Sequence, residues 1–364
     1  MTPSSPVPAA MFHPSPRRIL VICTRRIGDV LLTTPLMGSL RRAWPEAEVH
    51  ALVFRGTEGV LAGNPDIDRV IAVPERSRWQ QRLKELAGLW KRYDLAVSAV
   101  PSDRARIYGW ASARHRLGFA GEAPAEAGGE ARNFWLDDAL PFDDLHTHTV
   151  DMALQLADRL GIPRVGEVVP PRGDGSLPAG VSAPFAVLHP YPKFNYKMWR
   201  PEGWVALARA LQERGLAVWL SGGPEAAEVD YCRAIAAEAG VGSLAGQLSL
   251  AATTDLLRQA RLFVGPDTAA SHLAAACGIP TLALFGPSNP VKWGPWPAGW
   301  QGPGSPWAFV GSGRVGNVQL LQGAGDCVPC RLEGCDRHTA SYSRCLTEMT
   351  AERVIEAALG MLSD

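Results

Sequence analysis

Short apolar runs alternate with helical patterns along the first half of the chain. Residues 17–23 (RRILVIC) are β-branched and apolar, and they predict a buried parallel strand. A polar turn at 24–29 leads into a helical pattern from Val30 to Trp44. Further strands are predicted at 49–54, 70–73 and 94–100, with helices near Gly59 and from Trp79 to Tyr93. Strands that alternate with helices predict a parallel sheet with helices on both faces.

The alternation breaks after about residue 165 and restarts at residue 185. Between them, Val169–Pro184 is rich in Pro, Gly and Ser, which predicts an interdomain linker. In the second half, strands are predicted at 185–188, 217–220, 262–264 and 281–285, and helices at 204–214, 226–239, 254–260, 272–276 and 354–362. We therefore expect an α/β protein of two doubly wound halves. Ligands of such sheets bind at the carboxyl ends of the strands, in the cleft between the halves.

Composition narrows the function classes. Lys and Arg number 36 against 36 Asp and Glu, so no bulk charge is present to hold a nucleic acid. Apolar runs such as Ile19–Cys23 are far shorter than the roughly 20 residues that cross a bilayer. Residues 1–16 are rich in Pro and Ser and lack an apolar core segment, so a flexible tail is expected and not a secretory signal.

The most informative polar segment, residues 264–272 (VGPDTAASH), joins a predicted strand to a predicted helix. A helix N-terminus offers free N–H groups and a positive dipole end, which favour an anion. Thr268 adds a hydroxyl donor, and His272 lies one turn further along the same face. Asp267 is suited to orienting the backbone or to accepting from a ribose or sugar hydroxyl. The alternative is that Asp267 or Thr268 only caps the helix.

Two lysines follow the first strand of the second half, in residues 189–201 (HPYPKFNYKMWRP). Lys193 and Lys197 are candidates to neutralise a diphosphate, and His189 stands where the strand ends. The alternative is a solvated loop with unpaired lysines, which would expose Tyr, Phe and Trp together at a cost.

Two other strand ends carry carboxylates. Asp29 is a candidate general base toward an acceptor hydroxyl, although the motif alone favours a cap for the helix at Val30. Gly223 allows close backbone approach after the strand at 217–220, and Glu225 is placed to accept from a ribose hydroxyl. No Gly-x-Gly-x-x-Gly follows the first strand, which argues against a dinucleotide-binding dehydrogenase.

Four of the seven cysteines, Cys327, Cys330, Cys335 and Cys345, lie within nineteen residues. Four thiolates could hold a tetrahedral Zn or Fe ion, with His338 as a substitute ligand. The spacing differs from paired Cys-x2-Cys knuckles. Free thiols that pack a loop, or disulfides formed on isolation, are the alternatives.

Together these motifs resemble glycosyltransferase family 9, the ADP-heptose:lipopolysaccharide heptosyltransferases. The resemblance extends from about Arg17 to the last helix. It is carried by residues 26–35 (RIGDVLLTTP), 64–68 (NPDID), 197–199 (KMW), 265–276 (GPDTAASHLAAA), 285–288 (FGPS) and 293–295 (WGP). A Cys-x-Pro-Cys segment near the C-terminus also occurs in many family members.

The resemblance implies a GT-B fold, α/β with two Rossmann-like doubly wound domains facing across a cleft. The domains implied are an acceptor domain at 17–168, the linker at 169–184, a nucleotide-sugar-binding domain at 185–350 and a last helix at 351–364 that commonly crosses back to the N-terminal domain. The activity implied is an inverting, metal-independent transfer of heptose from ADP-heptose to an inner-core sugar of lipopolysaccharide, with no cofactor required.

Roles for single residues follow from the matching positions. Asp29 would be the general base, and Lys197 would stabilise the diphosphate leaving group. Asp267, Thr268 and His272 would hold the nucleotide-sugar. Ala269 stands where many family members have Gly. Alanine suits a first helical turn, but its Cβ adds bulk near the donor sugar.

The implied acceptor is large, amphiphilic and anionic, which implies a cytoplasmic enzyme with peripheral contact at the inner face of the cytoplasmic membrane. Trp79 and Trp90 are interleaved with basic residues and fit such contact. The favoured interpretation is nevertheless a normal helix whose aromatic stripe faces the core. Two other functions stay open: another GT-B transferase or epimerase with a different nucleotide-sugar, and a non-enzymatic nucleotide-sugar-binding protein.

Overall fold

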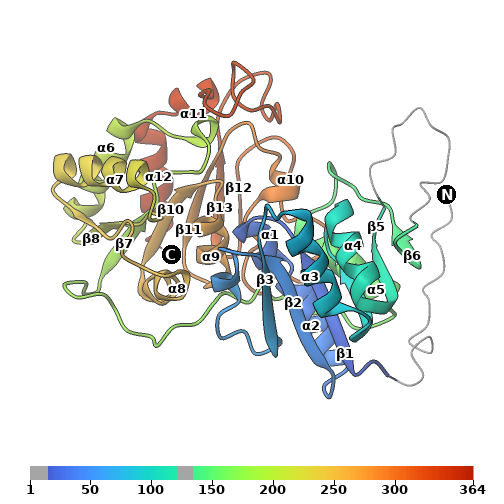
Figure 1. Cartoon of the computed structure of the whole chain (residues 1–364). Helices are drawn as coiled ribbons and strands as arrows, with labels where there is room; N and C mark the ends of the chain where they lie inside the picture. The colour runs from blue at the N-terminus through green and yellow to red at the C-terminus, as the bar shows by residue number, and fades with distance from the viewer. Residues whose placement is uncertain (1–14, 121–133, 364) are drawn as a thin grey trace. The chain divides into compact units, whose positions relative to one another are not determined.

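The computed structural model describes residues 15–120 and 134–363 (Figure 1). Most of the predicted N-terminal tail lies outside these residues. The described chain forms two compact units that divide between Val169 and Pro170, where the predicted linker begins. Each unit has its own largely parallel sheet with helices packed on it, which confirms the expected α/β class.

The sheet of the first unit has the strand order β3-β2-β1-β4-β5-β6, and its strands are all parallel. The strands are β1 (Arg18–Cys23), β2 (Glu48–Phe54), β3 (Arg69–Val73), β4 (Tyr93–Ser98), β5 (Ala113–Phe119) and β6 (Asp138–Leu140). Ile19 to Cys23 of the central strand β1 are fully buried. A central strand covered on both faces needs such a continuous apolar run.

The helices of this unit form two layers (Figure 1). They are α1 (Ile27–Leu32), α2 (Thr34–Ala43), the 3-10 helix η2 (Glu58–Leu61), α3 (Trp79–Leu89), α4 (Asp103–Ser112) and α5 (Thr149–Arg159). Helices α1, α2 and α5 pack together in one layer. Helix α4 packs on β1, β4 and β5 in the other layer, and α3 packs on α4.

The single helix predicted from Val30 to Trp44 is two helices, α1 and α2, which meet at Thr33. The Thr33 hydroxyl donates to the carbonyl oxygen of Asp29 at 2.8 Å. Pro35 has no N–H with which to continue the hydrogen-bond ladder of α1. The apolar periodicity continues through this break, so the sequence pattern alone did not predict it.

The sheet of the second unit has the order β12-β13-β11-β10-β7-β8-β9, and only β12 is antiparallel to its neighbour. The strands are β7 (Phe185–Leu188), β8 (Ala217–Leu220), β9 (Gly242–Ser243), β10 (Leu262–Pro266), β11 (Thr281–Phe285), β12 (Gly313–Val315) and β13 (Val318–Gln322). Four of them match the predicted strands closely. The sequence analysis missed β9, β12 and β13.

Helices of the second unit also form two layers. They are η3 (Asn195–Lys197), α6 (Pro201–Glu213), α7 (Ala226–Ala239), α8 (Leu250–Gln259), α9 (Ala269–Ala276), α10 (Pro290–Trp293), α11 (Arg344–Thr347) and α12 (Ala351–Gly360). Helix α6 packs on α7 and α12, whereas α9 packs on α8, β10 and β11. The last helix, α12, therefore has its packing partner in its own unit, and Val354 and Ala358 belong to the core there.

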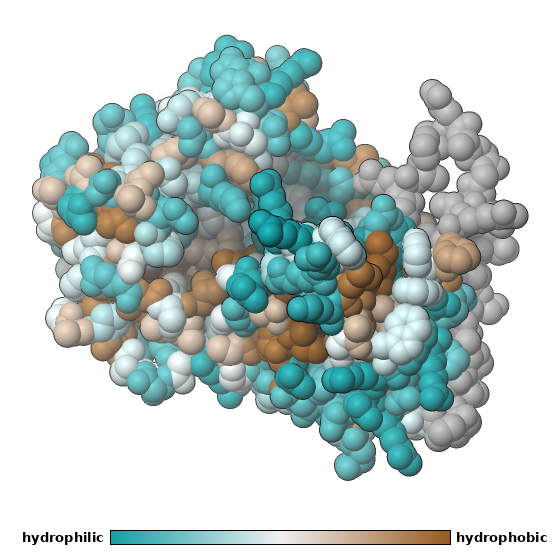
Figure 2. All heavy atoms as spheres, in the orientation of Figure 1, coloured by the Kyte–Doolittle hydropathy of each residue, from teal (hydrophilic) through white to brown (hydrophobic). Residues whose placement is uncertain are grey.

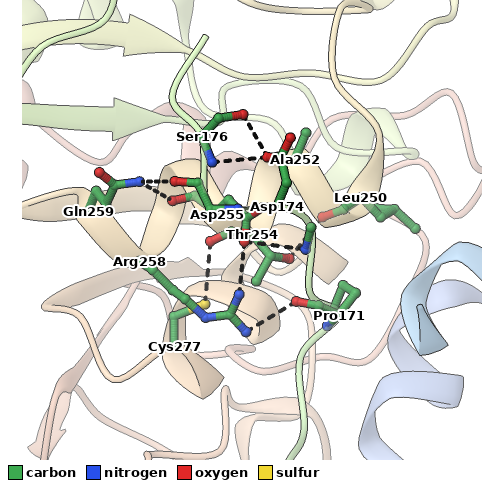
Figure 3. Close-up of polar contacts among 12 residues, drawn as sticks. Pro171, Asp174, Ser176, Leu250, Ala252, Thr254, Asp255, Arg258, Gln259 and Cys277 are labelled. Atoms are coloured by element: carbon green, nitrogen blue, oxygen red, sulfur yellow. Dashed lines mark hydrogen bonds and ion pairs between the residues drawn. The ribbon is translucent and has the colours of Figure 1, made fainter. Parts of the chain in front are cut away.

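The predicted linker is fixed to helix α8 at its N-terminal part (Figure 3). The buried carboxylate of Asp255 accepts from the backbone N–H groups of Gly173 at 3.4 Å and Gly175 at 2.9 Å. Arg258 donates to Asp255 and to the carbonyl oxygen of Pro171, both at 3.1 Å. A buried carboxylate with these donors is satisfied, so this stretch is an ordered part of the second unit.

Helix α3 departs from the favoured interpretation of its sequence. Its aromatic stripe does not face the core, because Trp79, Leu83 and Trp90 are exposed. Leu89 is the only residue of α3 that is buried. None of the helices in the described residues is long and apolar enough to cross a membrane.

Candidate functional site

The candidate site lies at the carboxyl edge of the second sheet. Strand β10 is central, between β7 and β11, and all three run parallel. The residues after these strands therefore gather at one edge. His189 follows β7, Asp267 follows β10, and the loop Gly286–Ser288 follows β11.

Lys197 and Asp267 form the central contact of this site. Lys197 Nζ lies 2.5 Å from Asp267 Oδ2, although the two residues come from different loops. The Asp267 side chain is 7% exposed and that of Lys197 is 21% exposed. Lys197 ends the short helix η3, and Trp199 just after it is buried and donates to the carbonyl oxygen of Met349 at 2.8 Å. The loop that carries the lysine is thus anchored in the core.

Asp267 is held in its charged form. Burial alone would raise its pKa, but the charge and hydrogen bond of Lys197, a hydrogen bond with Ser288 and the nearby His272 lower the pKa below its usual value. The paired Lys197 and Asp267 cancel in charge. The N-terminus of α9 adds a partial positive charge at the same edge of the sheet.

Among the residues that the structure describes, two buried polar atoms at the start of α9 have no hydrogen-bond partner. They are the Thr268 hydroxyl oxygen and Nδ1 of His272. Thr268 is the N-cap residue, but its side chain does not cap the helix. Burial lowers the pKa of His272 to about 4, so the imidazole is neutral near pH 7. Buried groups without partners are costly, and a bound polar ligand would satisfy both of them.

His189 lies at the same edge and is bonded to Ser221, which follows β8. Its Nδ1 is 3.1 Å from the Ser221 hydroxyl oxygen. Burial lowers the pKa of His189 to about 4. His189 was predicted to lie in the site, whereas Ser221 had no predicted role.

Lys193 and Glu225, two of the predicted donor-binding residues, are exposed. The carboxylate that lies over the turn at Gly223 is that of Glu228, three residues after Glu225. The Gly223 backbone N–H bonds to the Glu228 carboxylate, whose pKa is raised mainly by burial. A Cβ on Gly223 would come within 2.8 Å of Glu228 Oε2, so a larger residue there would require the Glu228 side chain to shift. The helical periodicity of α7 was the signal that could have indicated Glu228.

The four cysteines of the candidate metal site are not arranged as a ligand set in the described residues. Among the described residues, no group of three or more His, Cys, Asp or Glu side chains is arranged to hold a metal ion. Cys335 Sγ accepts from the Arg344 backbone N–H at 3.4 Å, and Cys345 packs against Gly286. Burial, then the nearby Cys330, Cys335 and Cys327, raise the pKa of Cys345 to about 12. The four thiols are therefore near neighbours, but their contacts differ from those of a ligand set.

The cysteine-rich segment, residues 327–345, instead supports two loops of the candidate site. The Ser343 hydroxyl donates to the carbonyl oxygen of Tyr196 at 2.7 Å, next to Lys197. The Arg331 backbone N–H donates to the carbonyl oxygen of Pro287 at 2.7 Å, next to Ser288. Both partners of Asp267 are thus held by this segment.

Asp29 belongs to the first unit, where it lies in the first turn of α1. Its carboxylate accepts from the Arg26 backbone N–H at 3.3 Å. The sequence favoured Asp29 as the N-cap of a helix beginning at Val30, but α1 begins at Ile27, its N-cap is Arg26, and Asp29 supports the helix start from the third helical position. Burial raises the pKa of Asp29, against the opposing effects of Arg25 and Arg26. A carboxylate with a raised pKa is a stronger base, so capping and proton transfer are compatible roles.

The chain is similar to known glycosyltransferases. Residues 149–301 match the family model described as glycosyltransferase family 9 (heptosyltransferase). Lipopolysaccharide heptosyltransferase 1 of Pseudomonas aeruginosa is 29% identical over 353 residues, which cover 92% of each chain. Lipopolysaccharide heptosyltransferase 3 of Escherichia coli K12 is 27% identical over 289 residues, 74% of this chain and 82% of the relative. The chain is a heptosyltransferase-like glycosyltransferase.

The fold of this glycosyltransferase is also that of solved structures. The structure of E. coli ADP-heptose lipopolysaccharide heptosyltransferase II has a TM-score of 0.71 and 21% sequence identity, and the match covers 95% of this chain and 98% of that one. The fold is therefore GT-B, with two Rossmann-like domains, as the resemblance implied.

The segment that matches the family model contains some of the candidate site residues but not all of them. Residues 149–301 include Lys197, Asp267 and His272, but they exclude Asp29. Ala269 is the first residue of α9, as expected for a first helical turn. Ser288 is the clearest residue without a predicted role. It lies in the segment FGPS that carried part of the resemblance, and only the folded loop brings it to Asp267.

Proposed function

We propose that this glycosyltransferase moves heptose from ADP-heptose to an inner-core sugar of lipopolysaccharide, with inversion at the anomeric carbon. The observation that carries the donor half of this proposal is the start of α9. There, Lys197 meets Asp267, and two buried polar atoms, on Thr268 and His272, have no partner in the described part of the chain. The relatives named for ADP-heptose and lipopolysaccharide support the choice of donor and acceptor.

The diphosphate of the donor would bind at the N-terminus of α9. Backbone N–H groups and the helix dipole favour an anion there, and the Thr268 hydroxyl and Lys197 would add donors. Asp267 repels a phosphate, so its proposed role is to hold Lys197 in place and to accept from a sugar hydroxyl. The neutral imidazole of His272 can also donate to or accept from the donor molecule.

In the proposed reaction, the acceptor hydroxyl oxygen attacks the anomeric carbon while the bond from that carbon to the diphosphate oxygen breaks. Asp29 would take the proton of the hydroxyl, and ADP would leave with the electron pair. Lys197 and the α9 N-terminus would stabilise the charge that develops on the diphosphate. Each well-placed donor contributes about 3–4 kcal/mol to such stabilisation. This field would do the work of a metal ion, so no metal is required in the proposal.

The proposed acceptor is attached to a lipid. The proposal therefore places the protein in the cytoplasm, in peripheral contact with the inner face of the cytoplasmic membrane.

The test is calorimetric titration with ADP, UDP and GDP, followed by turnover with ADP-heptose and a deacylated lipopolysaccharide core. Preference for ADP and a product of inverted anomeric configuration are expected. Preference for UDP or GDP would favour another nucleotide-sugar transferase or epimerase. Tight ADP binding without turnover on any core acceptor would favour a nucleotide-sugar-binding protein.

A further inference from the structure

Helix α3 has an apolar face that its own unit does not cover. Trp79 is 71% exposed, Leu83 is 55% exposed and Trp90 is 53% exposed. Their spacing of four and seven residues puts all three on one side of the helix. The helix packs on α4 through another side, where Leu89 is buried and Glu85 accepts from the Tyr108 hydroxyl. The exposed stripe is therefore not needed for packing in the first unit.

This face continues beyond α3 through a row of aromatic rings. The ring of Trp90 makes an edge contact with Trp110 at a centroid distance of 5.4 Å, and Trp110 makes another with Trp135, also at 5.4 Å. Trp135 contacts Phe134, which is 77% exposed. Lys91 Nζ donates to the carbonyl oxygens of Trp110 and Ala113 and lies 5.7 Å from the Trp90 ring centroid. Trp110 and Trp135 are half-buried and hold the row in place, whereas Trp90 and Phe134 at its ends are exposed.

The surroundings of the stripe are basic. Residues 76–92 include six Lys and Arg but a single acidic residue, although the whole chain is neutral. Arg78 and Lys84 are exposed beside the stripe. Figure 2 shows apolar side chains at the surface of the first unit among hydrophilic ones. Trp and Leu on one helical face, flanked by Lys and Arg, are typical of helices that lie in a membrane interface.

We propose that this face, formed by Trp79, Leu83, Trp90 and Phe134 and flanked by Arg78 and Lys84, binds the surface of an anionic lipid bilayer. Trp side chains would sit at the headgroup level, and the basic side chains would pair with lipid phosphates. Helix α3 would lie in the plane of the interface without spanning it. The basic side chains around this face favour an anionic lipid surface over an apolar protein partner. The choice of a lipid also rests on the proposed function, because the proposed acceptor is anchored in a membrane.

The test is co-sedimentation of the full chain with vesicles. We expect binding to vesicles of phosphatidylglycerol and phosphatidylethanolamine, weaker binding to phosphatidylcholine alone, and a loss of binding as salt rises. The double variant Trp79→Gln, Leu83→Gln should bind at least tenfold more weakly, and Arg78→Gln with Lys84→Gln about tenfold more weakly. Gln supports a helix, and thermal unfolding of each variant checks that the fold is kept.

Matched controls come from the second unit. Val310 is 64% exposed, and the Arg233 side chain is 69% exposed. Val310→Gln and Arg233→Gln should bind vesicles as the natural chain does. An equal loss in these controls, or no binding of the natural chain to anionic vesicles, would overturn the proposal.

The experiments distinguish a failure of the membrane proposal from a failure of the proposed function. Turnover on a deacylated core acceptor should be unchanged in the Trp79→Gln, Leu83→Gln variant. Vesicle binding without any turnover would defeat the proposed function alone, and turnover without vesicle binding would defeat the membrane proposal alone. Sedimentation velocity tests whether a second copy of the chain covers this face instead of a lipid. If the natural chain is an oligomer and the Trp79→Gln, Leu83→Gln variant is a monomer, the face binds a second copy and the proposal is overturned.

Discussion

The hydroxyl of Ser343 donates to the carbonyl oxygen of Tyr196 at 2.7 Å, so a residue of the cysteine-rich segment fixes the neighbour of Lys197. Ser343 and Tyr196 are more than a hundred residues apart in the chain. Ser343 is 2% exposed, and the contact is therefore sheltered from water. The segment that carries the candidate metal ligands is thus bonded to the loop of the lysine that meets Asp267.

This relationship predicts a functional effect for a residue outside the proposed contact with the donor. Ser343→Ala should lower the free energy of unfolding by about 1 kcal/mol and weaken ADP binding severalfold, because the loop of Lys197 loses an anchor. Calorimetry and urea unfolding measure the two effects. Ser341→Ala is the matched control: Ser341 is also 2% exposed, but its hydroxyl bonds to Asp336 and Tyr342 within the segment. Equal ADP affinities in the two variants would contradict the positioning role.

Lys197→Ala tests the central ion pair. The change leaves Asp267 buried without its cation, so the free energy of unfolding should fall by about 1–3 kcal/mol. ADP affinity should fall by tenfold or more, because a hydrogen-bonded charge is lost from the proposed diphosphate site. Lys193→Ala, on the same loop but exposed, should change neither quantity. A Lys197→Ala variant with unchanged ADP affinity would remove this lysine from the donor site.

Two buried histidines predict how stability depends on pH. The pKa values of His272 and His189 are lowered to about 4 in the folded chain. Between about pH 6.5 and pH 4 the unfolded chain therefore binds protons that the folded chain does not. The free energy of unfolding should fall with falling pH over this window, by up to about 1.4 kcal/mol per pH unit for each histidine.

His272→Gln should make that dependence shallower, since one of the two histidines is gone. Urea unfolding at steps between pH 4 and pH 7 measures the slope. His338→Gln replaces an exposed histidine and is the control. Asp267 acts in the same pH direction, because its pKa is also lowered in the folded chain: its stabilisation is lost as the pH falls toward that lower value. Identical slopes in His272→Gln and the natural chain would show that His272 titrates normally.

The sequence predicted most strands of the two sheets because buried parallel strands are continuous apolar runs. It predicted Asp267 and Lys197 at one sheet edge for the same topological reason. It could not predict which of Lys193 and Lys197 enters the site, because the difference in exposure between the two lysines depends on how the chain around Trp199 is buried. Nor could it find Ser288 as a partner of Asp267, since that contact is made only in the folded loop. The periodicity of α3 predicted a stripe, but a helical period does not say whether a stripe faces inward.

Asp29→Asn tests the proposed general base, and it separates proton transfer from helix capping. The amide oxygen of Asn can still accept from the Arg26 backbone N–H, which the carboxylate does at 3.3 Å. The fold and the ADP affinity should therefore be kept. Turnover should fall by about 10²–10⁴-fold, the usual contribution of general base catalysis, because the amide cannot take the acceptor proton. Steady-state kcat with saturating ADP-heptose measures this loss, and Asp103→Asn in the first turn of α4 is the matched control. If Asp29→Asn unfolds more easily but each folded molecule keeps its normal rate, then Asp29 is a cap and the base is another group.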